Sequence, residues 1–364
     1  MKRAAFLVPF RGIESPAARQ LLRSLVRFSS ELGLGIIGDM HQDVRSPFER
    51  RCYGAKVFTL LRSLKNIERL ALAAEKYDVV IVPYTTSFFH PLNPFEARVT
   101  VRLITKLLKR AHVILYVYDS PVLRKLVFDG RAPLHAVEAE KQLFGAAEAI
   151  MVFNTYFKEF IRDVYGIEAD RLIEFHLLDN YVKFTPPLHK TLGSPRKIVW
   201  AGNLSNLGSL PESVAHLRGA VLLAYGYGRV SSPLRRSVKY GGLILNEEEL
   251  VRNISHADFG LLYYGTRASS YLIFGSSMKF STYIVSGLPV ITTSDAVYPA
   301  LLVRRYNVGW VISNVEQLGD LLEEIDEVEY NRVRRNVLAL SQKIRRGYFF
   351  KKALVSSIRR VSRR

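Results

Sequence analysis

The fold is decided by one stretch of the chain, which runs from Tyr271 to Ile291 and reads YLIFGSSMKFSTYIVSGLPVI. The paired serines can cap a helix, Gly287 can end it, and the apolar residues that follow favour a buried strand. The stretch therefore predicts a helix over Met278–Ser286 and a strand over Leu288–Thr292.

The same alternation of helical segments and short apolar runs extends in both directions from this stretch. The strands expected before residue 186 are Ala4–Pro9, Gly33–Ile37, Ala55–Leu60, Val79–Pro83, His112–Tyr118, Ile150–Phe153 and Leu172–His176. Those expected after it are Lys197–Ala201, Ala220–Tyr225, Gly242–Leu245, Phe259–Tyr263, Leu288–Thr292 and Gly309–Ile312. Such alternation predicts an α/β fold with parallel sheets covered by helices. We expect two Rossmann-like domains that face a cleft. Ligands of such sheets bind beyond the carboxyl ends of the strands, so these ends should line the cleft.

The two series of strands are separated by a segment with three prolines, a glycine and short polar residues. That composition favours a linker, and 364 residues are enough for two domains. We expect an N-terminal domain over 1–185, a linker over 186–195, a C-terminal domain over 196–342 and a basic C-terminal helix over 343–364.

The chain is strongly basic, with 52 Lys and Arg against 33 Asp and Glu and a formal net charge of +19. Nucleic acid, an anionic membrane and a phosphorylated substrate could each account for the excess. Residues 343–364 hold nine basic and no acidic side chains, and basic residues also recur at helical spacing, without an acid, over 98–110. Each segment is either a membrane- or phosphate-contacting surface or an ordinary docked helix with a solvated charged face.

Cysteine content and hydropathy exclude several classes of protein. Cys52 is the single cysteine, which excludes a disulfide framework and a Cys-rich metal site. The apolar run near Met1 is cut by Arg11 and is too short for a secretory signal. No run of about 18 apolar residues is present. We expect a cytoplasmic protein, soluble or peripheral on the membrane.

Two positions in the second series suggest phosphate binding. Gly202 follows the first strand, where a glycine lets the backbone approach an anion; a simple tight turn is the alternative. Lys279 lies in the first turn of the helix before Gly287, where its charge and the helix dipole suit a pyrophosphate; a solvated lysine is the alternative. Neither Gly202 nor the turn at Arg11-Gly12 has the full Gly-x-Gly-x-x-Gly spacing, so no dinucleotide redox cofactor is expected.

The segment around Lys279 resembles the nucleotide-sugar signature of GT-B glycosyltransferases, in which a Lys stands eight residues before the Gly of a Gly-x-Pro-Val-Ile strand. More narrowly, the chain is similar to the bacterial glucosyltransferase and galactofuranosyltransferase type that modifies glycoproteins and surface polysaccharides. The motifs that carry this likeness are Trp200–Ser205, Tyr225-Gly226, Lys279-x-Ser-x-Tyr, Gly287–Ile291 and Gly347–Ala353. The resemblance implies a GT-B fold and transfer of a hexosyl group from a UDP-sugar to a glycan, glycoprotein or lipid-linked acceptor.

This resemblance and the residue chemistry together define a candidate site. The expected donor-binding residues are Gly202, Asn203, Gly226, Tyr271, Lys279 and Ser281. No Asp-x-Asp occurs in the chain, so cationic side chains and helix dipoles are expected to neutralise the leaving diphosphate without a metal. No cofactor is expected, because the UDP-sugar is a substrate.

The acceptor side is expected in the first domain. Asp119 follows an apolar strand and is the candidate catalytic base for the acceptor hydroxyl, with helix capping or a turn as its alternative role. Arg11, Arg124 and Asn154 are the other candidate residues on this side. A turn role is the alternative for Asn154, and a surface position is the alternative for Arg124.

Departures from the family pattern keep a second hypothesis open. Tyr264 replaces the Asp of a Trp-Asp-Gly motif, Gly275–Met278 replace Asn-Asn-Pro-His, and Thr282 stands where retaining enzymes carry a Glu. A non-catalytic glycosyltransferase-like subunit would show such changes. A nucleic-acid-binding protein is a third hypothesis, which the basic surface and 19 tyrosines would suit, although no recognised nucleic-acid motif is present.

Overall fold

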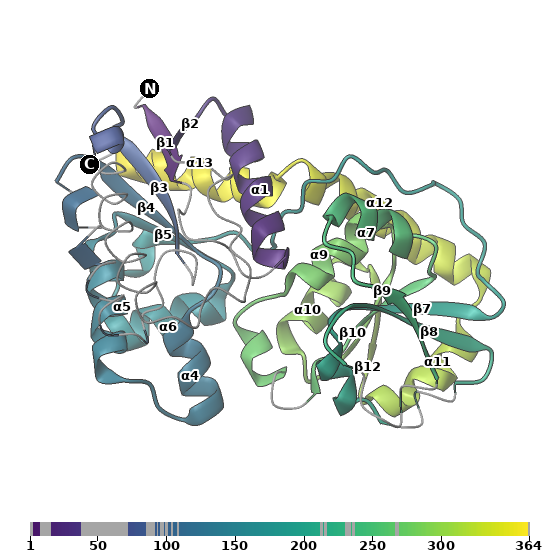
Figure 1. Cartoon of the computed structure of the whole chain (residues 1–364). Coiled ribbons are helices and arrows are strands. Elements are labelled where there is room, and N and C mark those ends of the chain that lie inside the picture. Colours follow the sequence, from purple (N-terminus) through teal and green to yellow (C-terminus); the bar gives the residue numbers. More distant parts are fainter. Residues whose placement is uncertain are drawn as a thin grey trace, which may run out of the picture. The chain divides into compact units, whose positions relative to one another are not determined.

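The computed structural model describes residues 3–7, 16–37, 72–84 and 109–362, together with positions 92, 94, 98, 101–102 and 105–107. The positions left out of the last range are 212–213, 215–216, 230–233, 235–236 and 266–268. The chain forms two compact units: unit 1 comprises Met1–His176 and Phe349–Arg364, and unit 2 comprises Leu177–Tyr348 (Figure 1). The division thus falls ahead of the expected linker, and most of the expected tail lies in unit 1.

Unit 1 is built on a parallel sheet of six described strands. They are β1 (Ala4–Leu7), β2 (Gly35–Ile37), β3 (Val79–Tyr84), β4 (His112–Val117), β5 (Ala149–Val152) and β6 (Leu172–Glu174). Their order is β2-β1-β3-β4-β5-β6, and every neighbouring pair is parallel. The central strands are buried along their whole length, as expected of strands covered on both faces. The strand expected over Ala55–Leu60 lies outside the described residues.

Helices of unit 1 begin and end at residues suited to those positions. The helices with described bounds are α1 (Pro16–Glu31), α4 (Pro121–Asp129), α5 (Leu134–Ala146), α6 (Thr155–Tyr165), the 3-10 helix η2 (Ala169–Arg171) and α13 (Tyr348–Ser362). Ser120 caps α4 by accepting a hydrogen bond from the backbone N–H of Leu123, and Gly130 ends that helix in the left-handed conformation, with φ 68°.

The C-terminal helix α13 packs as part of unit 1 (Figure 1). The Phe350 ring lies edge-on to the rings of Phe6 and Tyr116, with centroids 6.3 Å and 5.6 Å away. On its basic face, Lys351 donates to Glu31 at 2.8 Å and Arg360 donates to Asp170 at 2.6 Å. The docked-helix alternative therefore describes this segment, although Lys352 and Arg359 remain exposed.

The basic segment 343–364 is not one continuous helix. Helix α12 (Glu327–Arg345) ends just inside it, and α13 begins at Tyr348. Gly347, at φ 70°, separates the two helices, a conformation that glycine adopts readily.

Unit 2 also contains a six-stranded parallel sheet. Its strands are β7 (Arg196–Asn203), β8 (Ala220–Tyr227), β9 (Val238–Gly242), β10 (Phe259–Leu262), β11 (Val290–Thr293) and β12 (Gly309–Ile312). Their order is β12-β11-β10-β7-β8-β9, as in a doubly wound dinucleotide-binding sheet. In such a sheet all strands stay parallel, but successive strands are added outward on one side of the first strand and then, from the fourth strand, on its other side. The switch point therefore lies between β7 and β10.

The strand expected over Gly242–Leu245 was placed about one strand length too late in the chain. The observed strand β9 ends at Gly242, whose φ of 97° suits glycine and turns the chain away. Leu243 and Leu245 follow the turn and are exposed. The apolar Leu-Ile-Leu run was therefore mistaken for a buried strand.

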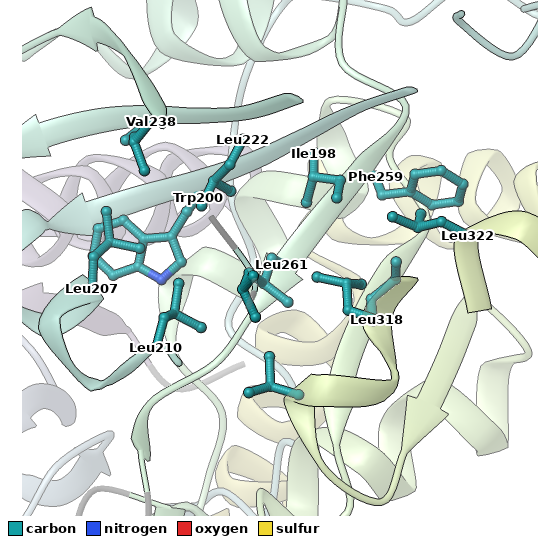
Figure 2. Close-up of a cluster of buried hydrophobic side chains, with 14 of the residues drawn as sticks. Ile198, Trp200, Leu207, Leu210, Leu222, Val238, Phe259, Leu261, Leu318 and Leu322 are labelled. Atoms are coloured by element: carbon teal, nitrogen blue, oxygen red, sulfur yellow. The ribbon is translucent and has the colours of Figure 1, made fainter. Parts of the chain in front are cut away.

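The remaining elements of unit 2 cover this sheet. They are η3 (Leu204–Ser209), α7 (Glu247–Ile254), η6 (Ser270–Ile273), α9 (Met278–Val285), α10 (Val297–Tyr306), η7 (Val315–Gln317), α11 (Leu318–Glu324) and α12. On one face, side chains of β7 and β10 pack against α11 and the segment after β7 (Figure 2). Trp200 is fully buried in this cluster, beside Leu207 and Leu210.

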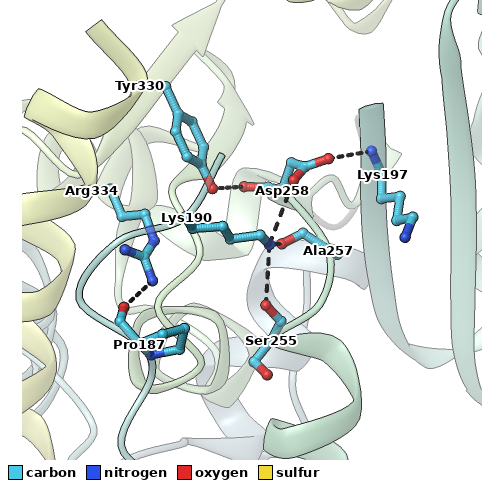
Figure 3. A network of polar contacts seen from close by, with 8 residues as sticks. All are labelled: Pro187, Lys190, Lys197, Ser255, Ala257, Asp258, Tyr330 and Arg334. Carbon is cyan, nitrogen blue, oxygen red and sulfur yellow. Dashed lines mark hydrogen bonds and ion pairs between the residues drawn. The ribbon is translucent and has the colours of Figure 1, made fainter. Parts of the chain in front are cut away.

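A buried polar network fastens the proline-rich segment to unit 2 (Figure 3). The Lys190 ammonium lies 3.5 Å from the Asp258 carboxylate and donates to the carbonyls of Ser255 and Ala257. Arg334 of α12 donates to the carbonyls of Pro187 and Leu188. Because the Lys190 side chain is only 15% exposed, partial burial lowers its pKa to about 8. These contacts make residues 187–190 part of unit 2.

The basic segment at 98–110 is described only in part. Arg98, Arg102 and Lys106 are exposed, whereas Leu107 is buried and Arg110 pairs with Glu75. None of the helices that the structure describes is both long and apolar enough to cross a membrane.

Candidate functional site

Helix α9 is anchored at the switch point of the unit 2 sheet, where β7 and β10 diverge. The Tyr283 hydroxyl donates to the Leu261 carbonyl at 3.1 Å and accepts from the Ala201 N–H at 3.0 Å. One side chain thus replaces the ladder hydrogen bonds that the diverging strands cannot make. In doubly wound sheets, ligands bind outside the carboxyl ends of strands at this point.

Lys279 lies one turn before Tyr283 on the same helix and reaches the ends of these strands. Its Nζ is 3.9 Å from the ring centroid of Trp200 on β7 and 4.8 Å from that of Tyr264, which follows β10. We call these two rings the aromatic box. Lys279 is half-buried, and burial lowers its pKa to about 7. No described residue forms an ion pair with it.

Two glycines shape the floor beneath Lys279. A Cβ at Gly202, where φ is 140°, would lie 2.6 Å from the Lys279 Cε. Gly226 pairs with Gly202 in register, and a Cβ at Gly226, where φ is 143°, would lie 1.7 Å from the Gly202 carbonyl oxygen. Gly202 therefore leaves room for the lysine, and Gly226 lets β7 and β8 meet at their carboxyl ends.

The first turn of α9 is the other element of this site. Ser277 is the N-cap residue, but its side chain forms no capping hydrogen bond with the helix. Its hydroxyl is instead hydrogen-bonded to the Tyr264 hydroxyl. The N-terminal end of the helix dipole, which attracts anions, thus lies beside the aromatic box and the lysine.

The other expected donor-binding residues of unit 2 have different surroundings. Asn203 accepts from the Ser205 N–H at 3.1 Å and starts η3, which is a turn role. Ser281 is buried and donates to the Leu178 carbonyl at 2.5 Å. Tyr271 lies in η6, which packs against α10. The structure thus brings Gly202, Gly226 and Lys279 together and gives Asn203 and Ser281 structural hydrogen bonds.

A carboxylate that sequence reasoning missed lies against the middle of α9. Glu247 of α7 accepts from the Thr282 hydroxyl at 2.7 Å and from the Asn180 side chain at 2.8 Å. Burial raises the pKa of Glu247. The sequence places Glu247 in the acidic first turn of a helix, which favours the helix start. The contact with Thr282 is long-range, so no local pattern reveals it.

In unit 1, the expected acceptor-side residues follow the ends of β4 and β5. Asp119 accepts from Arg124, and its side chain is 16% exposed against 49% for the arginine. Asn154 is buried and caps α6 by accepting from the Phe157 N–H at 2.9 Å. The turn role weighed for Asn154 is therefore observed. Arg11 lies outside the described residues.

Comparison with known proteins relates this chain to sugar-transferring enzymes. Residues 198–357 match the family model for the glucosyltransferase 3-like, C-terminal domain. Glucosyltransferase 3 of Streptococcus gordonii is 23% identical over 257 residues, which cover 69% of this chain and 72% of that protein. The β-1,6-galactofuranosyltransferase WbbI of Escherichia coli K12 is 22% identical over 52% of this chain and 57% of that protein.

Solved structures agree over the full length. The lipopolysaccharide outer core galactosyltransferase WaaB superposes with a TM-score of 0.54 over 98% of this chain and 99% of that one, at 14% identity. An α-glucosyltransferase in complex with UDP superposes with a TM-score of 0.59 over 97% and 98%, at 12% identity. The chain has the GT-B fold and is similar in sequence to nucleotide-sugar glycosyltransferases.

This assignment confirms the expected fold, and the relatives confirm the expected enzyme class. Sequence coverage is uneven, because the alignment with glucosyltransferase 3 of Streptococcus parasanguinis, 25% identical, spans 31% of this chain and 34% of that protein. The family match falls almost wholly on unit 2, which carries Lys279 and the aromatic box.

The protein also holds a buried carboxylate in unit 1 that was not predicted. Glu140 of α5 accepts from the hydroxyls of Tyr84, Ser120 and Tyr165 at 2.7–2.8 Å. Burial raises its pKa to about 6. It fixes Ser120, the residue after Asp119, and so supports the turn that presents the candidate base. Its partners lie 20 to 56 residues away, and no local pattern marks it.

Proposed function

We propose that this glycosyltransferase moves a hexosyl group from a UDP-sugar to a hydroxyl of a glycan, glycoprotein or lipid-linked acceptor without a metal. The observation that carries the proposal is Lys279, held in the aromatic box beside Gly202 at the switch point of unit 2. A half-buried lysine with no carboxylate partner among the described residues is suited to an anionic ligand.

The donor diphosphate supplies that anion. Lys279 and the N–H groups of the first turn of α9 would neutralise the charge that develops as the diphosphate leaves. A hydrogen bond from a charged group contributes about 1.5–3 kcal/mol, which corresponds to about 10- to 150-fold in affinity. A UDP donor is supported by the likeness to a structure that contains UDP.

The acceptor hydroxyl must lose a proton as it attacks the anomeric carbon. We propose Asp119 as the base that takes it, because its carboxylate follows β4, is only 16% exposed and is held by an ion pair with Arg124. Arg11, Arg124 and Asn154 are proposed as further residues on the acceptor side. The roles of Asp119, Arg124 and Asn154 rest on their positions after β4 and β5, and that of Arg11 rests on the sequence alone.

A lipid-linked acceptor would explain the exposed basic residues of unit 1. Arg98, Arg102 and Lys106 face solvent, as do Lys352 and Arg359 of α13. Each such residue near an anionic bilayer contributes about 1 kcal/mol. We propose that the cytoplasmic protein rests on the membrane through these segments. Sedimentation with vesicles of phosphatidylglycerol, but not of phosphatidylcholine, tests this, and equal binding to both would contradict it.

The donor assignment is tested by calorimetry and thermal shift in EDTA with UDP, GDP, ADP and duplex DNA. UDP should stabilise the protein, and Lys279→Ala should remove the effect. Lys239→Ala is the matched control, because Lys239 is an exposed lysine on the edge strand of the same unit. Salt-sensitive binding of DNA without any nucleotide effect would contradict the proposal.

Catalysis is tested by hydrolysis and transfer with a panel of UDP-sugars. Turnover would exclude a non-catalytic subunit. Asp119→Asn should keep UDP binding and reduce turnover by about 10²- to 10⁴-fold, the usual contribution of a catalytic base. Wild-type turnover in this variant would remove Asp119 from the mechanism.

A further inference from the structure

Two neighbouring strands of unit 1 are tied to the same buried carboxylate at their carboxyl ends. Tyr84 is the last residue of β3, and Ser120 lies just after β4, the parallel neighbour of β3 in the sheet. Both hydroxyls donate to Glu140 of α5, each at 2.8 Å. Glu140 and Ser120 are fully buried. The edge of the sheet at which ligands of parallel sheets bind is therefore fixed to one point on α5.

The carboxylate is supported from α5 and α6, which lie side by side (Figure 1). The hydroxyl of Tyr165, the last residue of α6, donates to Glu140 at 2.7 Å. Phe144 lies one turn after Glu140 on α5. Its ring meets those of Tyr84 and Tyr165 edge-on, with centroids 5.4 Å and 5.2 Å away. Close packing of this kind restricts the rotamers of both tyrosines, so their hydroxyls stay on the carboxylate.

A carboxylate suits this point because it can accept from many donors at once. Its two oxygens offer about four acceptor sites, whereas an amide side chain has a single acceptor oxygen. Besides the three hydroxyls, the Val122 N–H in the first turn of α4 donates to Glu140 at 3.4 Å. Burial of a charged group is unfavourable unless hydrogen bonds satisfy it, and a fully satisfied network rigidifies the groups that it joins.

Asp119 lies in the segment that this network holds. It immediately precedes Ser120, whose hydroxyl also caps α4 by accepting from the Leu123 N–H at 3.0 Å. Arg124, the ion-pair partner of Asp119, donates its backbone N–H to the Ser120 carbonyl at 2.9 Å. Both the backbone of Asp119 and the partner of its carboxylate are thus set by Ser120 and, through it, by Glu140.

Resting on the proposed function, we propose that Glu140 is a positioning residue for the transfer reaction, which acts through Ser120 to hold Asp119 where it takes the proton of the acceptor hydroxyl. Glu140 is fully buried, so it touches neither the substrates nor the reacting atoms, and it exchanges no proton in the reaction. A displacement of about 1 Å in a catalytic group can lower turnover by about 10²-fold. Loss of the link through Ser120 should therefore lower kcat and leave the binding of the donor to unit 2 unchanged.

Hydrolysis of a UDP-sugar, with water as the acceptor, measures kcat and KM at pH 8, where Glu140 is ionised. The substrate is the UDP-sugar that the wild type hydrolyses fastest. Ser120→Ala should lower kcat by about 10- to 100-fold with KM unchanged, and Ser120→Thr, which restores a hydroxyl, should recover most of the loss. Tyr165→Phe is the matched control, because it removes an equally buried hydroxyl from Glu140 at the end of α6 that is distant from β5. Its kcat should fall far less, and equal losses in Ser120→Ala and Tyr165→Phe would overturn the proposal.

A double-mutant cycle shows whether the network acts through Asp119. Glu140→Gln should lower kcat as well, because the amide keeps only one acceptor oxygen. In the Asp119→Asn background the base is already lost, so adding Glu140→Gln or Ser120→Ala should lower kcat little further. Losses that multiply across the two sites would show that the network affects activity by another route, and would refute the positioning role.

Hydrogen exchange of the amides in residues 118–124 reports on this segment without any substrate. Exchange should be faster in Ser120→Ala and Glu140→Gln than in the wild type, and unchanged exchange in both would also overturn the proposal. Failure of the proposed function gives a different result. A wild type that neither binds UDP nor hydrolyses a UDP-sugar removes the reaction and the role of Glu140 in it, whereas an active wild type with undiminished kcat in both variants refutes the positioning role alone.

Discussion

Replacing Gly202 by alanine tests whether the lysine seat determines nucleotide binding. The new Cβ would meet the Lys279 Cε at 2.6 Å. The Cε belongs to a flexible side chain, so the lysine can be pushed aside at a cost of about 1–3 kcal/mol for overpacking. The φ of 140° adds about 1–3 kcal/mol of backbone strain. We expect a loss of about 2–6 kcal/mol in unfolding free energy, and a displaced ammonium.

Displacement should weaken UDP binding by about 10- to 150-fold, the value of one charged hydrogen bond. Calorimetry with UDP and urea unfolding measure the two effects. Gly242→Ala is the matched control, because Gly242 has a φ of 97° and nothing within 4 Å of its Cβ position. It should reproduce the strain and leave UDP binding unchanged.

A double-mutant cycle separates steric conflict from strain. In the Lys279→Ala background, Gly202→Ala should cost only the strain part, so the two substitutions should be coupled by about 1–3 kcal/mol. Additive effects, or UDP binding that survives Gly202→Ala at wild-type strength, would refute the assignment of Gly202 as the seat of the lysine.

Three further substitutions test other parts of the structure. The pKa of Glu140 is raised from 4.5 to about 6, so its contribution to stability is full below pH 4.5 and is lost as the pH passes 6. The free energy of unfolding should therefore fall by about 2 kcal/mol between pH 4.5 and pH values above 6. Glu140→Gln should remove this fall when unfolding by urea is measured across that range, and an unchanged pH profile would contradict the assignment. Tyr283→Phe should cost about 1–3 kcal/mol, because it unpairs buried groups on both strands at the switch point; a neutral effect would show that the bridge is unimportant. Phe350→Ala should cost about 3–5 kcal/mol and expose the sheet of unit 1 to hydrogen exchange while unit 2 keeps its protection.

Much of the fold follows from local patterns. Apolar runs bounded by glycine and proline predicted most of the strands in unit 2 to within a few residues, because parallel strands buried on both faces are continuously apolar. The same rule failed at β9, where Leu243 and Leu245 form an apolar run that is exposed after Gly242. An edge strand lacks the double burial on which the rule depends.

Long-range packing could not be predicted in the same way. Phe350 of helix α13 packs on Phe6 and Tyr116, which precede it by 344 and 234 residues, so the place of this helix in unit 1 left no periodic signal in the sequence. Its basic side chains suggested a surface for an external anion, yet Lys351 and Arg360 pair with acids of unit 1. A charge count over a segment does not reveal partners that lie elsewhere in the chain.

The candidate site likewise contains residues that local patterns predict and residues that they do not. Lys279 was predicted because a cation in the first turn of a helix is a local signal. Trp200 and Tyr264 carried no such signal, since an apolar aromatic residue at a strand end is usually a core residue. Ser281 matched the family motif, but its hydroxyl holds Leu178. Motif membership therefore identified the region of the site, and geometry was needed to separate residues that face it from residues that support it.

The net charge of +19 has little to do with this site. Unit 2 holds 20 basic and 14 acidic side chains, so 13 of the 19 excess positive charges belong to unit 1. We propose that selectivity for an anion in unit 2 comes from Lys279, which is half-buried beside the aromatic box. A half-buried charge is screened less by salt than an exposed one, whereas the exposed basic residues of unit 1 are screened within about 10 Å. We propose that the two sources of positive charge serve two different ligands, the donor in unit 2 and an extended anionic surface in unit 1.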